Sequence, residues 1–245
     1  MMPYKKKPQD IQREYYSRTA SSYDDMHLHH DDENYIALKY ISSLIDFLDI
    51  STILDVGCGT GRGIKWLLEK HSIKVIGIEP VQALLEQAIH KNNIPKDSII
   101  LGSGELLPFE DNSFDAVCEL SVLHHVPKPN VIVSEMMRVA KKAIFLSDSN
   151  RFGQGSMPLR IIKVLVYKMN LWNIANLIKT RGKCYMISEG DGLSYSYSVF
   201  DSYNKLISWA DRIILVPTTK IKTQTKSWVH PLITSGHVLL CAIKD

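Results

Sequence analysis

Three closely spaced glycines follow a short apolar run and an acidic residue, and this pattern predicts a ligand-binding turn. The run is ILDVGCGTGRG, residues 53–63, with Asp55 near the end of its apolar part and glycines at 57, 59 and 61. Glycine adopts backbone conformations that other residues avoid and carries no Cβ, so the chain can turn tightly and approach a ligand closely. We therefore expect a ligand to lie across this turn.

The spacing of the glycines also separates classes of ligand. The dinucleotide fingerprint G-x-G-x-x-G, counted from Gly57, puts Arg62 where close packing requires glycine. A P-loop needs G-K-S or G-K-T after its first glycine, and no such tripeptide follows here. The turn therefore disfavours a pyrophosphate ligand.

A second acidic residue, Glu79, ends the next apolar run and stands 18 residues after Gly61. A carboxylate at this place can accept hydrogen bonds from both hydroxyls of a ribose. Alternatively, it is an acid at the N-terminus of the helix expected from Val81, where the helix dipole favours negative charge. Its register with the glycine turn favours the ligand-binding role.

Two segments carry a family resemblance: DVGCGTG at 55–61 and GSGELLPFEDNSFDAV at 102–117. They resemble motifs of the class I, Rossmann-like S-adenosylmethionine-dependent methyltransferases, in the small-molecule, type 11-like branch, and the likeness covers about residues 15–148. It implies S-adenosyl-L-methionine as cofactor and S-adenosyl-L-homocysteine as product. The cofactor-binding residues that it implies are Asp55, Gly57, Cys58, Gly59, Gly61, Glu79, Pro80, Ser103, Gly104, Glu105, Glu119, Tyr16, Arg18 and Tyr23.

Ser103 departs from the pattern of that family. The family usually has an aspartate at this place, which accepts from the adenine amino group, and a hydroxyl is a weaker, uncharged acceptor. We expect the backbone of Gly104 and apolar contacts to hold adenine instead, and to hold it more loosely.

Two adjacent histidines, His124 and His125, lie in a loop that resembles the family loop beneath the reactive sulfonium. A neutral imidazole can deprotonate a hydroxyl as methyl is transferred, or it can simply hydrogen-bond a loop. Asp148, after the fifth expected strand, is a second candidate base or substrate anchor, with turn formation as the alternative. Asp148 and Asn150 have no third ligand in register, so we predict no metal site there.

The N-terminal segment YYSRTASSYDD, residues 15–25, resembles the leader helix of the family, which closes over the methionine carboxylate. Its matching residues are Tyr16, Arg18 and Tyr23. The run HLHHDDEN that follows contains metal-ligating residue types, but alternating His and Asp is typical of a solvated loop. Metal ligands need a folded geometry that this local spacing does not supply.

Strands and helices that could position these residues alternate along the chain. Short runs rich in Val and Ile predict five strands, at 52–56, 74–78, 98–101, 115–119 and 143–147. Apolar residues at helical spacing predict helices at 34–49, 63–70, 81–91 and 130–139. This order predicts an α/β, doubly wound, mostly parallel sheet in a three-layer sandwich. Two later strands, 212–216 and 237–243, would complete seven strands with an antiparallel edge.

An insertion interrupts this alternation after the fifth strand. It holds an apolar helical stretch from about Leu159 to Ile178 and the polar run ISEGDGLSYSYS, and a helix is expected at 199–209. We expect the apolar helix to be a lid or a dimer surface rather than a membrane anchor. The resulting parts are a leader (1–33), a cofactor-binding core (34–150), a substrate-binding insertion (151–198) and the completion of the sheet (199–245). Insertion residues suited to a substrate pocket are Tyr185, Glu189, Asp191, Tyr195 and Tyr197.

Composition limits the partners and the compartment. The 245 residues are 45% hydrophobic, enough for one large core, and the net charge of +3 creates no field that favours nucleic acid. No segment approaches the ~20 apolar residues of a membrane span, and no apolar run follows the N-terminal lysines. The four cysteines have no metal-binding spacing. We expect a cytoplasmic monomer or homodimer with reduced cysteines and no membrane insertion.

The resemblance and the histidine pair together predict the type of reaction. We expect methyl transfer to a small polar acceptor, first of all to a hydroxyl of a sugar, a glycan precursor or a secondary metabolite. The N/D-P-P-Y motif used on planar nitrogens of nucleic acid does not occur in the sequence. The alternatives are N- or C-methylation of a small molecule, a nicotinamide oxidoreductase, and a non-catalytic binding module on the same fold.

Overall fold

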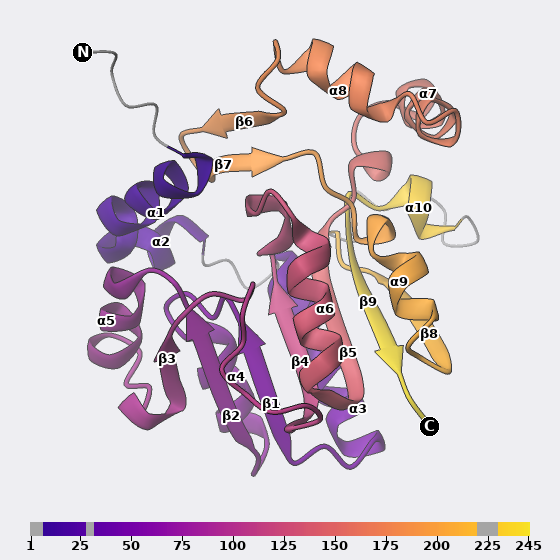
Figure 1. Cartoon of the computed structure of the whole chain (residues 1–245). Coiled ribbons are helices and arrows are strands. Elements are labelled where there is room, and N and C mark those ends of the chain that lie inside the picture. The colour runs from indigo at the N-terminus through magenta and orange to yellow at the C-terminus, as the bar shows by residue number, and fades with distance from the viewer. Residues whose placement is uncertain (1–6, 28–31, 220–229) are drawn as a thin grey trace.

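The computed structural model describes residues 7–27, 32–219 and 230–245, and its centre is one large sheet with helices on both faces (Figure 1). A separate two-stranded hairpin lies above one edge of that sheet. In chain order the elements are α1 (Pro8–Thr19), α2 (Tyr23–His27), α3 (Glu33–Phe47), β1 (Thr52–Val56), α4 (Arg62–Lys70), β2 (Lys74–Glu79), α5 (Gln82–His90), β3 (Ile99–Leu101), β4 (Phe114–Leu120), α6 (Pro129–Val139), β5 (Ala140–Ser149), α7 (Met157–Lys168), α8 (Trp172–Lys179), β6 (Tyr185–Ser188), β7 (Gly192–Tyr195), α9 (Tyr203–Ile207), β8 (Arg212–Pro217), α10 (Pro231–Thr234) and β9 (His237–Ile243).

The large sheet has seven strands in the order β3-β2-β1-β4-β5-β9-β8. The first five strands in this order pair in parallel, whereas β9 is antiparallel to both β5 and β8. The doubly wound, mostly parallel sheet with antiparallel pairing at one edge is therefore confirmed. The antiparallel strand is β9, which lies one position in from that edge.

Each face of the sheet has its own layer of helices and its own hydrophobic core. Val117 and Ile144 face the core that α6 and α9 cover. Their neighbours Ala116 and Phe145 face the core that α3, α4 and α5 cover. Successive side chains of a strand point to opposite faces, so strands covered on both sides are apolar at nearly every position. The result is the expected three-layer sandwich.

The carboxyl ends of the parallel strands meet at the upper edge of the sheet in Figure 1. The helices α1 and α2 and the hairpin of β6 and β7 lie across this edge. Ligands of open α/β sheets bind at such an edge, in the crevices between the loops. The loops after β1, β2, β4 and β5 are therefore the natural place for a site.

The insertion has more regular structure than the sequence pattern indicated. The single helical stretch expected up to Ile178 is wrong, because α7 and α8 are separate helices with Asn170, at a φ of 57°, between them. The run ISEGDGLSYSYS supplies most of the β6–β7 hairpin. The expected helix at 199–209 is shorter, because Ser198 and Asp201 form a capping box on a separate turn before α9. Across the described ranges, no helix combines the length and hydropathy needed to cross a bilayer.

Candidate active site

The glycine turn after β1 has the backbone geometry expected from its sequence. Gly57 and Gly61 have φ values of 77° and 75°, in the left-handed region that favours glycine. A Cβ on Gly57 would lie 2.5 Å from Cγ2 of Val122, in the loop after β4. The turn thus brings bare backbone close to the neighbouring loop, and Gly61 leads directly into α4.

Glu79 ends β2 beside this turn with its carboxylate buried. The carboxylate accepts hydrogen bonds from the backbone N–H of Gly59, at 3.1 Å, and of Val81, at 3.0 Å. Burial raises the pKa of Glu79 to about 7, although both hydrogen bonds act to lower it. The same carboxylate lines a cavity of about 120 Å³, here called the Glu79 cavity. Glu79 can therefore hydrogen-bond the backbone at the start of α5 and still border the space for a ligand.

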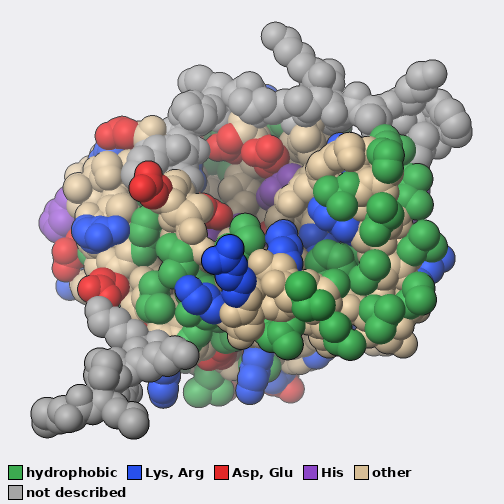
Figure 2. All heavy atoms as spheres, turned by 90° about the horizontal axis from the view of Figure 1, so that it is seen from above, with side chains coloured by type: hydrophobic (Ala, Val, Ile, Leu, Met, Phe, Trp, Pro, Cys, Tyr) green, Lys and Arg blue, Asp and Glu red, His purple; other side chains and the backbone are tan. Residues whose placement is uncertain are grey.

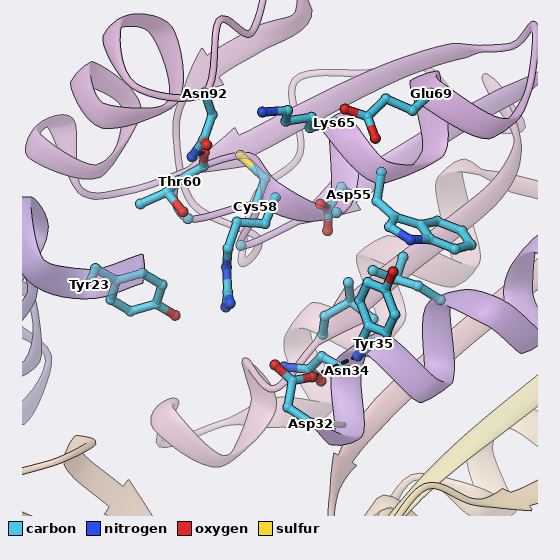
Figure 3. A pocket seen from close by; sticks show the side chains of 17 residues that line it. Tyr23, Asp32, Asn34, Tyr35, Asp55, Cys58, Thr60, Lys65, Glu69 and Asn92 are labelled. Atoms are coloured by element: carbon cyan, nitrogen blue, oxygen red, sulfur yellow. Dashed lines mark hydrogen bonds between the residues drawn. The ribbon is translucent and has the colours of Figure 1, made fainter. Parts of the chain in front are cut away.

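Asp55, near the carboxyl end of β1, is a second buried acid at the turn. The Cys118 thiol lies 3.8 Å from its Oδ1, and burial raises the pKa of Asp55 to about 7. Its side chain borders a cavity of about 480 Å³ between the turn, α3 and α4 (Figure 3), here called the turn cavity, which Cys58 also lines. Two carboxyl groups that titrate near neutral pH therefore flank one glycine turn.

The loop after β3 closes the Glu79 cavity on one side. Pro80, Ser103 and Glu105 line it, and Oγ of Ser103 accepts the N–H of Glu105 at 3.3 Å. Gly104 instead packs toward the core, where a Cβ would lie 2.7 Å from Cγ1 of Val56. Gly104 is not among the residues at the cavity wall in the described chain, so its contact with adenine stays a prediction.

The leader covers both cavities. Tyr16 lines the Glu79 cavity and Tyr23 lines both, and their ring centroids are 5.6 Å apart. Arg18 is exposed and, among the described residues, borders none of these cavities, whereas Arg13 of the same helix lines the Glu79 cavity. The structure therefore places Arg13, and not Arg18, near the site.

Asp24 links the leader to the glycine turn through hydrogen bonds. It is buried, and its carboxylate accepts from Oγ1 of Thr60 at 2.6 Å and from Nδ2 of Asn92 at 3.1 Å. Hydrogen bonds to a buried charged group are stronger than those between neutral groups. This residue had no motif of its own, and its partners are 36 and 68 positions away.

His125 lies between the leader and the hairpin. The Tyr16 hydroxyl is 2.9 Å from its Nε2, and the Leu193 carbonyl of β7 is 2.7 Å from its Nδ1. A carbonyl can only accept, so Nδ1 carries a proton, while Nε2 lies near both the Tyr16 hydroxyl and, at 3.4 Å, Oδ1 of Asp191. His125 lines the Glu79 cavity and also a cavity of about 450 Å³, here called the histidine cavity. It therefore joins loops and also presents a basic nitrogen.

His124 is held between two carboxylates. Its Nδ1 lies 2.6 Å from Oδ1 of Asp148, and its Nε2 lies 3.3 Å from Oδ2 of Asp191. Burial alone would lower the pKa of His124, but the charge of Asp148 and the hydrogen bonds to both carboxylates raise it to about 10. These contacts favour the protonated imidazolium at neutral pH and so argue against a base at His124, whose catalytic role stays a prediction.

The surroundings of Asp148 also argue against the role of a base. It is completely buried, and its oxygens accept from the backbone N–H groups of His124 and Ser149. Burial would raise its pKa, but the neighbouring imidazolium outweighs this and lowers it. Within the described chain it borders none of the cavities at this edge. In this structure Asp148 orients His124, and its role as a base or substrate anchor stays a prediction.

A third histidine, His237 at the start of β9, also lines the histidine cavity. Burial lowers its pKa to about 4, so it is neutral. Ser121 donates its proton to Oδ1 of Asn34 at 2.9 Å, so Nε2–H of His237 donates to Ser121 at 3.2 Å. Its other nitrogen faces the Thr218 hydroxyl at 2.7 Å. No local motif marks His237, because its neighbours come from three distant segments.

Glu119, which the resemblance implied as a cofactor residue, is completely buried. It accepts the N–H of Val122 at 3.0 Å, and burial raises its pKa well above the usual value. Within the described chain it borders none of the four cavities at this edge of the sheet. Its position indicates support for the loop after β4 rather than direct contact with a ligand.

The hairpin covers the site from above, and the role of the insertion in substrate binding stays a prediction. A cavity of about 220 Å³, here called the lid cavity, shares His124 and Asp191 with the histidine cavity. Glu189 is not at its wall, and only the backbone carbonyl of Glu189 is engaged, by the Tyr15 hydroxyl at 2.7 Å. The other expected pocket residues, Tyr185, Tyr195 and Tyr197, all line the lid cavity.

His124, His125 and Asp191 form the one group of three metal-ligating side chains found within the described ranges. One ligand atom from each lies within 4.8 Å of the others. Both histidines use Nδ1 elsewhere, so each Nε2 faces Asp191, an arrangement that could hold a divalent metal. Without a metal, Nε2 of His125 is within hydrogen-bond distance of the Tyr16 hydroxyl, and Nε2 of His124 is within hydrogen-bond distance of Asp191. The absence of a metal site stays a prediction, and residues 28–31 of the HLHHDDEN run lie outside the described residues.

Comparison with known sequences finds a family match in the central part of the chain. Residues 54–146 match the methyltransferase domain family. Phosphoethanolamine N-methyltransferase 2 of Caenorhabditis elegans is 27% identical over 159 residues, which are 62% of this chain and 36% of that protein. The 2-methyl-6-phytyl-1,4-hydroquinone methyltransferase of Synechocystis sp. is 28% identical over 154 residues, 56% of this chain and 48% of that protein. The chain spans roughly a third to a half of the length of the curated relatives it matches.

Comparison with solved structures gives the same fold over nearly the whole chain. A Thermotoga maritima structure, described as an SAM-dependent methyltransferase and possible histamine N-methyltransferase, aligns with a TM-score of 0.61. The alignment covers 96% of this chain and 100% of that one at 19% identity. At this identity the likeness concerns the arrangement of strands and helices.

Proposed function

Since residues 54–146 match the methyltransferase domain family, we propose that the chain is an S-adenosyl-L-methionine-dependent methyltransferase acting on a small polar acceptor. The acceptor group is a hydroxyl in this proposal, on a sugar, a glycan precursor or a secondary metabolite. The observation that carries the proposal is that two cavities lie side by side. The Glu79 cavity and the histidine cavity share Tyr16, Tyr23, Ser121 and His125.

The residues around the glycine turn fit the cofactor chemically. The Glu79 carboxylate is buried and borders open space, as a group that binds a ribose diol should. Gly57 and Gly59 line both the turn cavity and the Glu79 cavity and carry no side chain, so a ligand can lie against the backbone itself. Asp55 supplies negative charge next to the turn, suited to a ligand with a cationic amino group and sulfonium.

In this proposal the parts of the cofactor follow the order of the strands. Asp55 and the turn from Gly57 to Gly61 hold the methionine part, and Glu79 holds the ribose. Ser103 and Glu105, which line the same cavity as Glu79, border the adenine. Tyr16 and Tyr23 cover the cofactor from the leader and exclude water, which strengthens the electrostatic contacts beneath them.

When bound, S-adenosyl-L-methionine supplies a methyl group on a positively charged sulfur, which is already strongly activated for in-line displacement. The protein then has to align the acceptor oxygen and remove its proton. His125 suits the second task, because the Leu193 carbonyl fixes its proton on Nδ1 and leaves Nε2 as the acceptor at the border of the two cavities. The acceptor hydroxyl takes the place of Tyr16 at this nitrogen.

The other charged groups position the acceptor. The His124 imidazolium can donate from Nε2, and Asp191, which is partly exposed, can accept from a second hydroxyl. Asp148 keeps His124 charged and oriented from behind. A donor and an acceptor side by side match a polar molecule with several hydroxyl groups better than an apolar one.

A binding experiment separates this proposal from its rivals. We expect S-adenosyl-L-methionine and S-adenosyl-L-homocysteine to raise the melting temperature of the chain, and reduced nicotinamide dinucleotides to leave it unchanged. Purified protein that carries S-adenosyl-L-homocysteine would argue against a cofactor-free binding module. No shift with either sulfur compound at millimolar concentration would contradict the proposal.

A further inference from the structure

The insertion exposes a large apolar surface, here called the lid surface and comprising residues 157–187. Of the twenty exposed large hydrophobic side chains among the described residues, thirteen fall in this stretch. Ile178 is 74% exposed, Met169 65% and Ile187 58%. Neither α7 nor α8 has a single buried residue. Such a concentration of exposed apolar side chains marks a surface for interaction.

The charges on this stretch have one sign. No acidic residue occurs from Ser149 to Ser188, although an even spread of the chain's 26 acids would put about four in these 40 positions. The same positions contain seven Lys and Arg residues. This segment is therefore cationic, although the net charge of the whole chain is only +3.

The cations divide into an inner and an outer group. Arg151 pairs with Asp201, Arg160 donates to the Ile233 carbonyl at 3.0 Å, and Lys163 donates to the Arg151 carbonyl at 2.8 Å. Arg151 and Arg160 hold the insertion to the rest of the chain, and Lys163 links α7 to the start of the insertion. The remaining four are exposed: Lys168, Lys179, Arg181 and Lys183. Figure 2 shows hydrophobic side chains gathered on the side where α7 and α8 lie, with Lys and Arg side chains among them and at their margin.

We propose that the lid surface docks onto a membrane leaflet that contains anionic phospholipid. Exposed apolar side chains enter the boundary between head groups and acyl chains, and Lys and Arg around them meet the anionic head groups. A second copy of this chain is a poorer occupant, because two such surfaces face to face would bring like charges together. Acidic side chains on this surface would repel anionic head groups, so docking onto such a leaflet accounts for their absence from the stretch.

Docking would place the lid cavity at the membrane interface. Trp172 and Lys179 of α8 line that cavity, and His124 and Asp191 line both it and the histidine cavity. The ring of Trp172 also lies 4.8 Å from the Arg151 guanidinium, which fixes α8 to the core. The docking rests on the surface alone and does not depend on methyl transfer.

Vesicle sedimentation of the full chain tests the proposal. We expect the protein to sediment with vesicles of phosphatidylcholine containing 30 mol% phosphatidylglycerol, and to stay in the supernatant with phosphatidylcholine alone. Raising salt from 0.05 to 0.5 M should weaken sedimentation by about tenfold, because the surface potential is screened. Calorimetric binding of S-adenosyl-L-homocysteine without vesicles, run on the same sample, tests the proposed function separately.

Matched variants locate the binding surface. In the apolar variant Ile162, Met169 and Ile178 are changed to Asn, and we expect at least a tenfold lower partition onto the anionic vesicles. The control changes Tyr40, Phe47 and Ile207, which are exposed elsewhere, to Asn and should bind as the wild type does. A charge variant, Lys168, Lys179 and Lys183 to Gln, should lose a similar factor, and its control is Lys70, Lys96 and Lys141 to Gln.

Three results would overturn the proposal. The first is wild-type protein that stays in the supernatant with anionic vesicles at low salt. The second is a pair of lid variants that sediment as well as their controls. The third is light scattering that finds a stable homodimer which the apolar variant converts into a monomer, since the lid surface would then be a protein interface.

Discussion

The cofactor side and the acceptor side of this site are built in different ways. Around the glycine turn, Asp55, Gly57 and Glu79 stand at the ends of adjacent parallel strands, and their spacing in the sequence is set by the fold itself. Around His124 and Asp191, the contacts join the loop after β4 to a hairpin 67 residues away. A local motif can therefore specify the first region, whereas the second depends on how the insertion folds back.

The difference extends to electrostatics. The two acids at the turn have pKa values raised to about 7 by burial, against which the charge of Arg13 acts only weakly on Glu79. On the acceptor side, His124 and its carboxylates compensate one another, and the pKa of His124 is raised to about 10. One region is poised to receive a cation, and the other already contains one. The predictions below test this division in order of expected effect.

The largest expected effect is on cofactor affinity. Glu79→Ala removes the buried carboxylate and should raise the dissociation constant for S-adenosyl-L-homocysteine by about 100-fold, since hydrogen bonds to a charged group contribute about 1.5–3 kcal/mol each. Isothermal titration calorimetry measures it. Glu86→Ala, which removes an exposed acid on α5, is the control and should bind normally. Normal binding by Glu79→Ala would contradict the assignment of Glu79 as a cofactor-binding residue.

His125→Gln should lower the rate of methyl transfer by about 100-fold, the usual contribution of a general base. Its dissociation constant for S-adenosyl-L-homocysteine should stay within about twofold of the wild-type value, because Glu79 is untouched. Single-turnover rates, once an acceptor is in hand, give the first number and calorimetry the second. His90→Gln, an exposed histidine, serves as control. An unchanged rate would leave His125 as a residue that only joins loops.

A smaller effect is expected from pH. Cofactor binding needs ionised Glu79 and Asp55, and the pKa of each lies at about 7 in the empty protein. Affinity should therefore fall about tenfold or more as pH is lowered from 8 to 6. Titrations in buffers of different ionisation enthalpy should detect proton release on binding at pH 7. A flat profile would mean that these acids do not contact the ligand.

The same shift makes a prediction of opposite sign for the empty protein. The folded pKa of Glu79 is raised above the unfolded value near 4.5, so the folded state binds more protons between about pH 4.5 and 7. The free energy of unfolding should thus fall as pH rises through this window. Glu79→Gln should flatten that slope and raise the melting temperature at pH 8 by a few degrees, while cofactor binding weakens. A steeper slope in the variant would contradict the burial argument.

The smallest expected effect concerns adenine. Ser103 lines the Glu79 cavity, and Ser103→Asp should tighten cofactor binding a few-fold by adding a charged acceptor for the adenine amino group. Ser113→Asp, in the loop before β4, is the control. Unchanged affinity in calorimetry would show that the adenine lies elsewhere than the loop after β3.

Much of the fold and about half of the site could be predicted from the sequence. Continuous apolar runs identified every strand of the large sheet, because strands buried on both faces leave a strong local signal. Asp55, Gly57 and Glu79 were recognisable because strand ends meet at one edge. The β6–β7 hairpin was missed, although the EGD loop before Gly192 between short apolar runs is a hairpin signal.

The remaining misses have a common physical cause. His237 and Asp24 act through partners far away in the sequence, so no spacing marks them. His124 was assigned as a possible base from its reference pKa, which two carboxylates from distant elements change. Arg18 was chosen from a motif, but the pitch of α1 turns Arg13 toward the cavity instead. Local patterns predict positions, and only the folded chain determines protonation and orientation.

One calorimetric comparison tests the division between the two sides most directly. Wild type, Glu79→Ala and His125→Gln are titrated with S-adenosyl-L-homocysteine under one condition at pH 8. The account predicts one site per chain in the wild type, nearly the same affinity in His125→Gln, and about 100-fold weaker binding in Glu79→Ala. Absence of binding by the wild type, or an equal loss in both variants, would contradict it.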